Sequence, residues 1–269
     1  MDIENDKYKL LHGDCHERLN DIEDNSLDLI ISSPPYDSIR DYNSKWQLDL
    51  SKLGSQLYQK AKDGCVCAII IQDGSKDFAK SLTSFKLAVD WCDNHSWRLF
   101  ETCIYYRHGR PGAWWSKRFR VDHEYIFFFL KGDRPKYFNK EPLKIKSIHP
   151  GSGFHGTQRT TDGLLNRRVS SNKTEKTKCR GTIWKYSTSN TERNKIKMQH
   201  PATFPDALAL DIIKCFSKEG DKVLDPMFGS GTTVRMALTQ KRYGMGIEIN
   251  DEYFDIARKI CEKETNQIF

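Results

Sequence analysis

Short apolar runs alternate with amphipathic stretches over most of the 269 residues. Compact apolar runs that end at Gly, Pro or Asp are typical of buried strands, and we expect them at 27–31, 65–71, 98–106, 125–130, 222–224 and 243–249. Apolar positions with helical spacing predict helices at 48–62, 78–94, 204–217, 232–240 and 253–264. Strands that alternate with helices predict an α/β fold with one doubly wound, mainly parallel sheet.

The pattern changes in the middle of the chain. Between 131 and 197 the apolar periodicity fades, and Ser, Thr, Asn, Gly and Lys accumulate. Regular patterning resumes after this segment. We therefore expect the two halves of one α/β domain at 1–130 and 198–269, with an inserted region at 131–197.

Charge is segregated along the sequence. The formal net charge is +7, but residues 107–200 hold 22 Lys and Arg against 7 Asp and Glu, which leaves 21 against 29 elsewhere. Lys and Arg clusters neutralise phosphates, so this segment indicates a polyanion partner. A solvated surface loop is the alternative that composition leaves open.

Several classes of protein are disfavoured. The longest apolar runs fall well short of the roughly 18 residues that span a bilayer, and the N-terminus has no secretory signal pattern. The eight cysteines form no Cys-x-x-Cys pair and no zinc-finger spacing. We therefore expect a cytoplasmic protein with reduced thiols, without a metal and without a membrane span.

A cofactor motif follows the strand at 222–224. Asp225 precedes a Gly229-Ser230-Gly231 turn that opens a helix, and Glu248 ends the next strand. Glycines let a ligand approach the backbone, and a helix N-terminus presents free N–H groups. An acidic residue at the next strand tip is placed to accept hydrogen bonds from ribose hydroxyls. The motif predicts a nucleoside-cofactor site; an ordinary βα turn is the alternative.

The details favour one nucleoside. Gly231 is followed by Thr232 instead of the lysine that a triphosphate site needs, and Val234 stands where a dinucleotide motif has its third glycine. The Asp225 carboxylate would repel a pyrophosphate and hold an α-ammonium. S-adenosylmethionine carries the ribose, ammonium and carboxylate that fit these features.

A second motif, Ser33-Pro34-Pro35-Tyr36, ends the first strand. Proline has no N–H, so consecutive prolines fix the turn and leave rigid carbonyl acceptors. With the Ser33 hydroxyl and the Tyr36 ring, these acceptors are suited to grip a planar heterocycle that carries an amino group. A plain strand terminator is the alternative for this tetrapeptide alone.

Together the two motifs resemble the DNA amino-methyltransferases of restriction-modification systems. The resemblance extends to His12-Gly13-Asp14-Cys15, to His123-Glu124-Tyr125 and to the segment from His200 to Pro205. It implies a Rossmann-like methyltransferase sheet, a catalytic half at 1–130, a target-recognition region at 131–197 and a cofactor-binding half at 198–269. The catalytic motif precedes the cofactor motif, an order called the beta group.

The resemblance also implies a role for each matching residue. The catalytic residues would be Ser33, Pro34, Pro35 and Tyr36. Around S-adenosylmethionine the resemblance places Asp14 and Cys15 at the adenine, Glu248 at the ribose, Ala202 and Phe204 closing the pocket, and Asp225, Phe228, Gly229, Ser230, Gly231, Thr232 and Thr233 at the methionine end. Met227, where relatives often have Phe, departs from the pattern without removing a polar contact.

The implied reaction is direct attack of an exocyclic nitrogen on the sulfonium methyl group, with the base flipped out of duplex DNA. Relatives with Ser at position 33 usually act on cytosine N4 and those with Asp on adenine N6, so a cytosine-N4 enzyme is expected and an adenine-N6 enzyme is the alternative. A DNA-binding module without activity is the non-enzyme alternative. A restriction endonuclease acting on the same site is the implied protein partner. The expected DNA contacts are Arg107, Arg110, Lys117, Arg118, Arg167 and Arg168.

Overall fold

The structure is a computed structural model that describes residues 2–35, 48–108, 119, 121–187 and 204–268. It divides into two compact units. Unit 1 comprises residues 1–139 and 182–269, and unit 2 comprises Lys140–Gly181. Each unit is described by itself.

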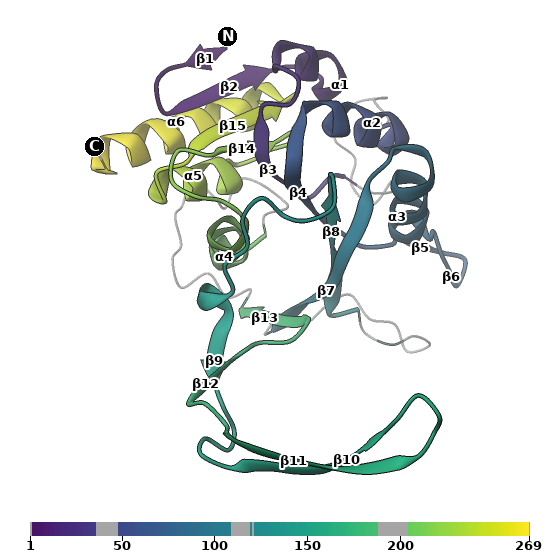
Figure 1. Ribbon diagram of the computed structural model, residues 1–269. Helices are drawn as coiled ribbons and strands as arrows, with labels where there is room; N and C mark the ends of the chain where they lie inside the picture. The colour runs from purple at the N-terminus through teal and green to yellow at the C-terminus, as the bar shows by residue number, and fades with distance from the viewer. Residues whose placement is uncertain (1, 36–47, 109–118, 120, 188–203, 269) are drawn as a thin grey trace. The chain divides into compact units, whose positions relative to one another are not determined.

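The described residues of unit 1 form a nine-stranded sheet (Figure 1). In spatial order its strands are β1 (Ile3–Glu4), β2 (Tyr8–His12), β15 (Tyr243–Glu248), β14 (Lys222–Asp225), β3 (Leu27–Ser32), β4 (Ala61–Ile71), β8 (His123–Leu130), β7 (Arg98–His108) and β13 (Ile183–Ser187). Strands β2, β15, β14, β3 and β4 run parallel to one another, and β13 runs parallel to β7. Strand β1 is antiparallel to β2, and β8 is antiparallel to both β4 and β7. This mainly parallel sheet confirms the predicted α/β class.

Helices cover both faces of the sheet (Figure 1). They are α1 (Cys15–Arg18), α2 (Leu50–Lys60), α3 (Thr83–Asn94), α4 (Asp206–Phe216), α5 (Thr232–Thr239) and α6 (Asp251–Ile268). Helices α2 and α3 contribute Leu57 and Trp91 to one core, and α5 and α6 contribute Val234 and Ala257 to another. Adjacent residues of β2 enter the two cores, because successive strand residues point to opposite faces.

Helix α2 packs very closely on α3. A Cβ built on Gly54 would lie 2.4 Å from Trp91 Nε1, which donates to the Leu50 carbonyl at 2.8 Å. The adjacent Trp97 Nε1 donates to the Gly54 carbonyl at 2.9 Å. Glycine at position 54 is therefore a packing requirement of this core.

Two strands differ from the sequence expectations. Strand β13 lies within the predicted insert but pairs with β7. Its Trp184 and Tyr186 are buried, whereas the alternate residues Ile183, Lys185 and Ser187 are exposed. The Tyr186 ring meets Tyr105 of β7 edge to face, with 5.9 Å between centroids. The compact unit at Lys140–Gly181 is consequently narrower than the predicted 131–197. Strand β2, which we did not predict, lies beside β15.

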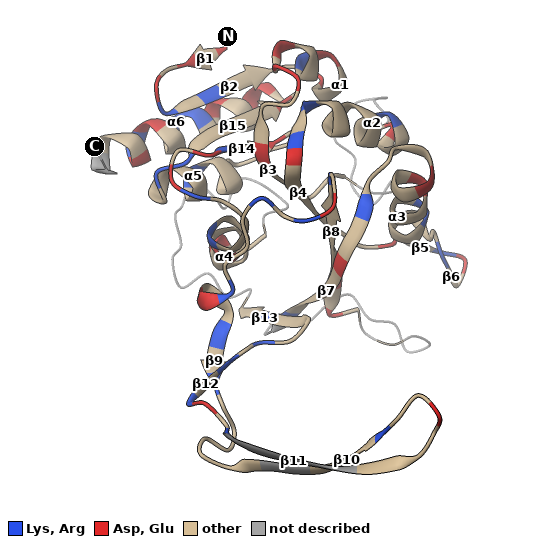
Figure 2. Ribbon diagram, viewed as in Figure 1, with Lys and Arg blue, Asp and Glu red and all other residues tan. Residues whose placement is uncertain are grey.

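Unit 2 contains two separate two-stranded ladders. Strand β9 (Lys144–Lys146) pairs with β12 (Thr177–Cys179), and β10 (Gly153–Arg159) pairs with β11 (Leu165–Lys173). Lysines lie on both β9 and β12 (Figure 2). The unit has ten Lys and Arg against three Asp and Glu, so it keeps the positive charge seen in the sequence. Of the helices described in the whole chain, none is long and apolar enough to cross a membrane.

Candidate functional site

The sequence motifs meet at one edge of the sheet. Strands β2, β15, β14 and β3 are parallel neighbours, so their carboxyl ends lie side by side. These ends carry Asp14, Glu248, Asp225 and Ser33, respectively. Ligands of open α/β sheets bind outside this edge.

Asp225 ends β14 and is almost fully buried, with 2% of its surface exposed. One carboxylate oxygen accepts from Ser32 Oγ at 3.1 Å and from the Met227 N–H at 3.2 Å. The other oxygen accepts from Thr233 Oγ1 at 2.7 Å. Burial raises the pKa of Asp225 to about 7, because desolvation outweighs these three donors. The Asp225 carboxylate therefore stabilises the turn after β14 through buried hydrogen bonds. Its contact with the α-ammonium group of S-adenosylmethionine, expected from the sequence, stays a prediction.

Ser32 is the residue that sequence reasoning missed. It is fully buried at the last position of β3, and its hydroxyl joins the end of β3 to the cofactor turn after β14. The available signal was a hydroxyl at the end of a buried strand whose other residues, except Asp28, are apolar. Because Ser33 follows directly, this bond links the two predicted motifs.

The turn after β14 depends on its glycines. Gly229 and Gly231 have φ values of +51° and +85°, which a side chain would strain. Gly231 begins α5, and its N–H donates to the Phe228 carbonyl at 2.8 Å. The Phe228 ring fills the space beside Gly246, where a Cβ would lie 2.7 Å from the ring. The sequence therefore folds this turn tightly against β15.

Glu248, at the end of β15, holds two backbone donors. Its carboxylate accepts from the N–H groups of Gly229 and Asn250, both at 2.9 Å. Burial raises its pKa, although these donors act in the opposite direction. The Glu248 carbonyl also accepts from Gly13 N–H at 2.9 Å, which joins β15 to the turn that carries Asp14.

The turn after β2 places two further predicted residues. The Asp14 carboxylate accepts from the His16 N–H at 2.7 Å and so caps α1. Cys15 is 3% exposed, and burial raises the pKa of its thiol to about 12. A buried thiol of this kind is neither a nucleophile nor a metal ligand at neutral pH.

Thr232 tests whether this edge suits the expected cofactor. Its Oγ1 atom is buried at the start of α5 and has no hydrogen-bond partner among the described protein atoms. A buried hydroxyl without a partner is costly unless a ligand completes it. With the carboxylates of Asp225 and Glu248 close by, this edge fits a ligand that offers a carboxylate together with hydroxyl and cationic groups.

The base-gripping motif is described in part. Ser33 is half-buried and Pro34 is buried directly after β3, whereas Tyr36 lies outside the described residues. The adjacent end of β4 was not singled out from the sequence. There, Gln72 Nε2 donates to the His123 carbonyl at 2.6 Å, and Asp73 accepts from the Ser84 N–H at 2.8 Å. These bonds fix the start of β8 and the start of α3.

The predicted DNA contacts are described unevenly. Arg107 is on β7, where its guanidinium lies 3.3 Å from Glu124 and donates to the Val121 carbonyl at 3.2 Å. Its charge is therefore engaged within the protein. Phe204 is partly buried before α4. Ala202, Arg110, Lys117 and Arg118 lie outside the described residues, and Arg167 and Arg168 are described only through the backbone pairing of β11.

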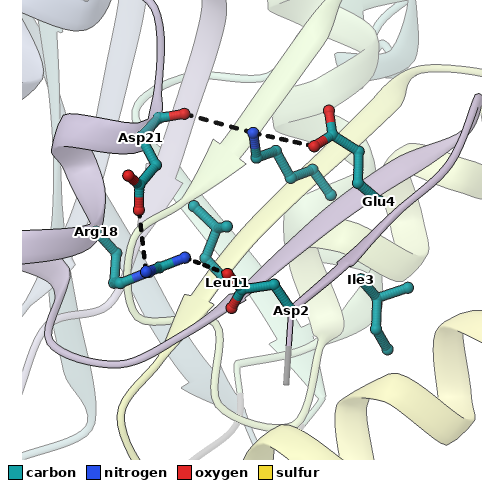
Figure 3. Close-up of a pocket in the computed structure, with 7 residues that line it drawn as sticks. Asp2, Ile3, Glu4, Leu11, Arg18 and Asp21 are labelled. Carbon is teal, nitrogen blue, oxygen red and sulfur yellow. Dashed lines mark hydrogen bonds and ion pairs between the residues drawn. The ribbon is translucent and has the colours of Figure 1, made fainter.

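A cavity of about 360 Å³ lies elsewhere, beside β1 and β2. Figure 3 shows that its charged side chains pair with one another. Arg18 pairs with Asp2 and Asp21, and Lys9 lies 3.1 Å from Glu4. It contains none of the predicted site residues. Within the described part of the chain, no group of three or more His, Cys, Asp or Glu is arranged to hold a metal ion.

Comparisons with known proteins give a family match over most of the chain. Residues 27–259 match the N6_N4_Mtase family, described as DNA methylase. The chain is 33% identical over 241 residues to the orphan methyltransferase M.BamHII of Bacillus amyloliquefaciens, covering 88% of this chain and 89% of the relative. It is 26% identical to the type II methyltransferase M.BglII of Bacillus subtilis, covering 96% and 70% of the two chains.

Solved structures show the same fold. The chain superposes on the PvuII DNA methyltransferase (cytosine-N4-specific) with a TM-score of 0.71 at 18% identity, covering 98% of this chain and 93% of the other. It superposes on an M1.HpyAVI–SAM complex with a TM-score of 0.61 at 22% identity, covering 94% and 98%. At these identities the likeness concerns the fold.

Proposed function

Because the chain belongs to the N6_N4_Mtase family of DNA methylases, we propose that it transfers a methyl group from S-adenosylmethionine to the exocyclic N4 of a flipped cytosine in duplex DNA. The observation that carries this proposal is the Ser32–Asp225 hydrogen bond, which holds the two motifs next to each other at the carboxyl edge of the sheet. A DNA-binding module without activity would need no such link.

S-adenosylmethionine is the cofactor, and it supplies an electrophilic methyl carbon when bound. We assign its carboxylate to the Thr232 hydroxyl and the turn at Gly229–Gly231, its ribose to Glu248, and its adenine to the turn at Asp14–Cys15. The unpartnered Thr232 hydroxyl supports this assignment. Asp225 would contribute mainly by fixing the turn, because its oxygens already accept three hydrogen bonds.

The protein's own contribution to the reaction is to position the base. The Ser33 hydroxyl and the Pro34 carbonyl would accept from the exocyclic amine and aim its lone pair away from the ring. No covalent enzyme intermediate is needed, because the nitrogen is itself the nucleophile. The buried thiols agree with this, since burial raises the pKa of Cys15 to about 12 and that of Cys67 well above its usual value.

Cytosine is favoured over adenine by the neutral hydroxyl at position 33. In the resemblance, Ser at this position accompanies cytosine and Asp accompanies adenine. Mass spectrometry of nucleosides from duplex DNA treated with the protein tests this choice. We expect N4-methylcytosine, and its loss in Ser33→Ala with cofactor affinity retained. N6-methyladenine as the sole product would overturn the proposal and favour the adenine alternative.

Duplex DNA is the proposed partner, and the inserted region is the proposed target-recognition region. Its described core is the positively charged unit 2. A restriction endonuclease that cuts the same site is a further proposed partner. Methylation itself does not require it, and one relative is named as an orphan methyltransferase. Action on cellular DNA agrees with the cytoplasmic location expected from the sequence.

A further inference from the structure

The ladder of β10 and β11 in unit 2 is unusual for a β structure, because neither face of it has a buried side chain among the described residues. We define it, with its connecting turn, as the ribbon, residues 153–173. Among its described side chains, from Gly156 to Asn166 and at Lys173, none is buried. Isolated two-stranded ribbons are marginally stable in water and usually need a covered apolar face. Apart from Leu164 and Leu165, the described residues of this ribbon are polar or glycine, which suits a polar partner.

The ribbon is fixed at both ends by hydrogen bonds. At its tip the Thr160 N–H donates to the Leu164 carbonyl at 2.9 Å, and Gly163, with φ of +84°, closes the turn. At its base the Thr174 N–H and Oγ1 both donate to the Ser152 carbonyl at 2.9 Å. The strands keep one register from Phe154↔Ser170 to Arg159↔Leu165, and the pairing shifts at a bulge between Gly153 and Phe154.

The register places residues with base-reading chemistry on one face. Gln158 lies directly opposite Asn166, so the two share a face of the ribbon, and both are exposed. Arg159 lies opposite Leu165, and this pair belongs to the other face. Asn and Gln form paired hydrogen bonds with N6 and N7 of adenine in the major groove. Gln158 and Asn166 are each two residues from the Thr160–Leu164 turn, so both can contact the same base pair.

The charge of unit 2 and the two-stranded form of the ribbon favour the major groove of duplex DNA as its binding site. Unit 2 carries ten Lys and Arg against three Asp and Glu, which complements a phosphate backbone. The major groove of B-form DNA, about 12 Å wide, admits a two-stranded β-ribbon. In A-form RNA the major groove is too deep and narrow to be read in this way. The exposed Leu164 at the tip is suited to a thymine methyl group.

We propose that the ribbon enters the major groove of duplex DNA and that Gln158 and Asn166 read at least one A·T pair of the recognition sequence. This inference rests on the proposed function and adds to it the specificity-determining residues. It assigns direct base reading to the face that carries Gln158, whereas Arg159 on the other face contacts the backbone.

The test compares the full-length parent protein with Gln158→Ala, Asn166→Ala and the double variant. Each protein methylates a pool of duplexes with randomised sequence, and sequencing that detects modified bases reads out the motif. We expect the double variant to lose discrimination at one or two A·T positions by on the order of 10- to 100-fold. Arg159→Ala is the matched control, which should weaken binding equally for all sequences and reduce its salt dependence.

A second arm uses the parental recognition sequence with 7-deazaadenine in place of one adenine at a time. This base lacks the N7 acceptor but keeps Watson–Crick pairing. We expect one such duplex to be methylated more slowly by the parent and at an unchanged relative rate by the double variant. If the double variant keeps the parental motif, or slows on all duplexes alike, the ribbon does not read bases. If the parent itself methylates no duplex, the proposed function fails instead.

Discussion

Replacing Ser32 by alanine removes one of three donors to the buried Asp225 carboxylate. The Ser32 hydroxyl donates to it at 3.1 Å across 193 residues of sequence, and both residues are almost without solvent contact. The Met227 N–H and the Thr233 hydroxyl remain as donors. The substitution replaces a hydroxymethyl group by a methyl group, so it changes packing little.

The size of the loss depends on the charge of Asp225. A hydrogen bond to an ionised group contributes about 1.5–3 kcal/mol, and one to a neutral group about 0.5–1.5 kcal/mol. With a pKa of about 7, Asp225 is mostly ionised at pH 8 and mostly protonated at pH 6. We therefore expect Ser32→Ala to lower the free energy of unfolding by about 2 kcal/mol at pH 8 and by roughly half as much at pH 6.

Urea unfolding at the two pH values measures this loss, and single-turnover methylation measures its effect on the neighbouring Ser33. We expect slower methylation at an unchanged cofactor affinity, with rescue by Ser32→Thr, which keeps the hydroxyl. Ser217→Ala is the matched control, since its buried hydroxyl donates to the Ile213 carbonyl at 2.6 Å and accepts from Arg242 Nε at 3.1 Å instead of donating to a carboxylate. Equal losses at pH 6 and pH 8, with parental turnover, would refute the reasoning.

Substitutions at Thr232, Asp225 and Gly54 test three further features of the structure. Thr232→Val should not lower the free energy of unfolding and should slightly raise it, because the buried hydroxyl that it removes has no protein partner among the described residues. It should weaken S-adenosylmethionine binding by about 1 kcal/mol in calorimetry; equal affinity would remove Thr232 from the site. The free energy of unfolding of the parent, relative to that of Asp225→Asn, should be greatest below pH 3.8 and should fall as the pH rises through 7. The reason is that the raised pKa of Asp225 makes the folded state hold its proton more tightly than the unfolded state does. A difference in melting temperature that stays constant across this pH range would contradict the raised pKa. Gly54→Ala should cost about 1–3 kcal/mol of stability by overpacking against Trp91, whereas Gly181→Ala, which has open space for its Cβ, should cost far less in the same chemical unfolding assay.

The sequence pattern predicted the strands in which nearly every residue is buried. Buried parallel strands such as β3 and β4 have long apolar runs, and the turns after β3 and β14 contain the residues that terminate them. Strand β13 was missed because it alternates between exposed and buried residues inside a lysine-rich segment. The alternation of Ile183, Trp184, Lys185 and Tyr186 was the available signal.

The site was predictable in its members but not in its internal bonding. The positions of Asp225 and Glu248 follow from the strand ends, because parallel strands bring such ends together. The sequence does not specify that Thr233 and Ser32 donate to Asp225, since that depends on the order of strands in the sheet. It also gives no sign that Arg107 is paired with Glu124, because the partner is on the neighbouring strand.

The sheet order has a consequence for how this chain folds during synthesis. Strand β14 pairs directly with β3, and β15 joins β14 to β2, so the strands made last occupy the middle of the sheet. Until residue 248 has left the ribosome, β14 and β15 cannot fill the space between β2 and β3. During that time the edge of β3 that will pair with β14 is open. Closing such a long loop is entropically costly and slow, and open edges invite pairing with other chains. The nascent chain therefore depends on protection from aggregation until its last strand emerges.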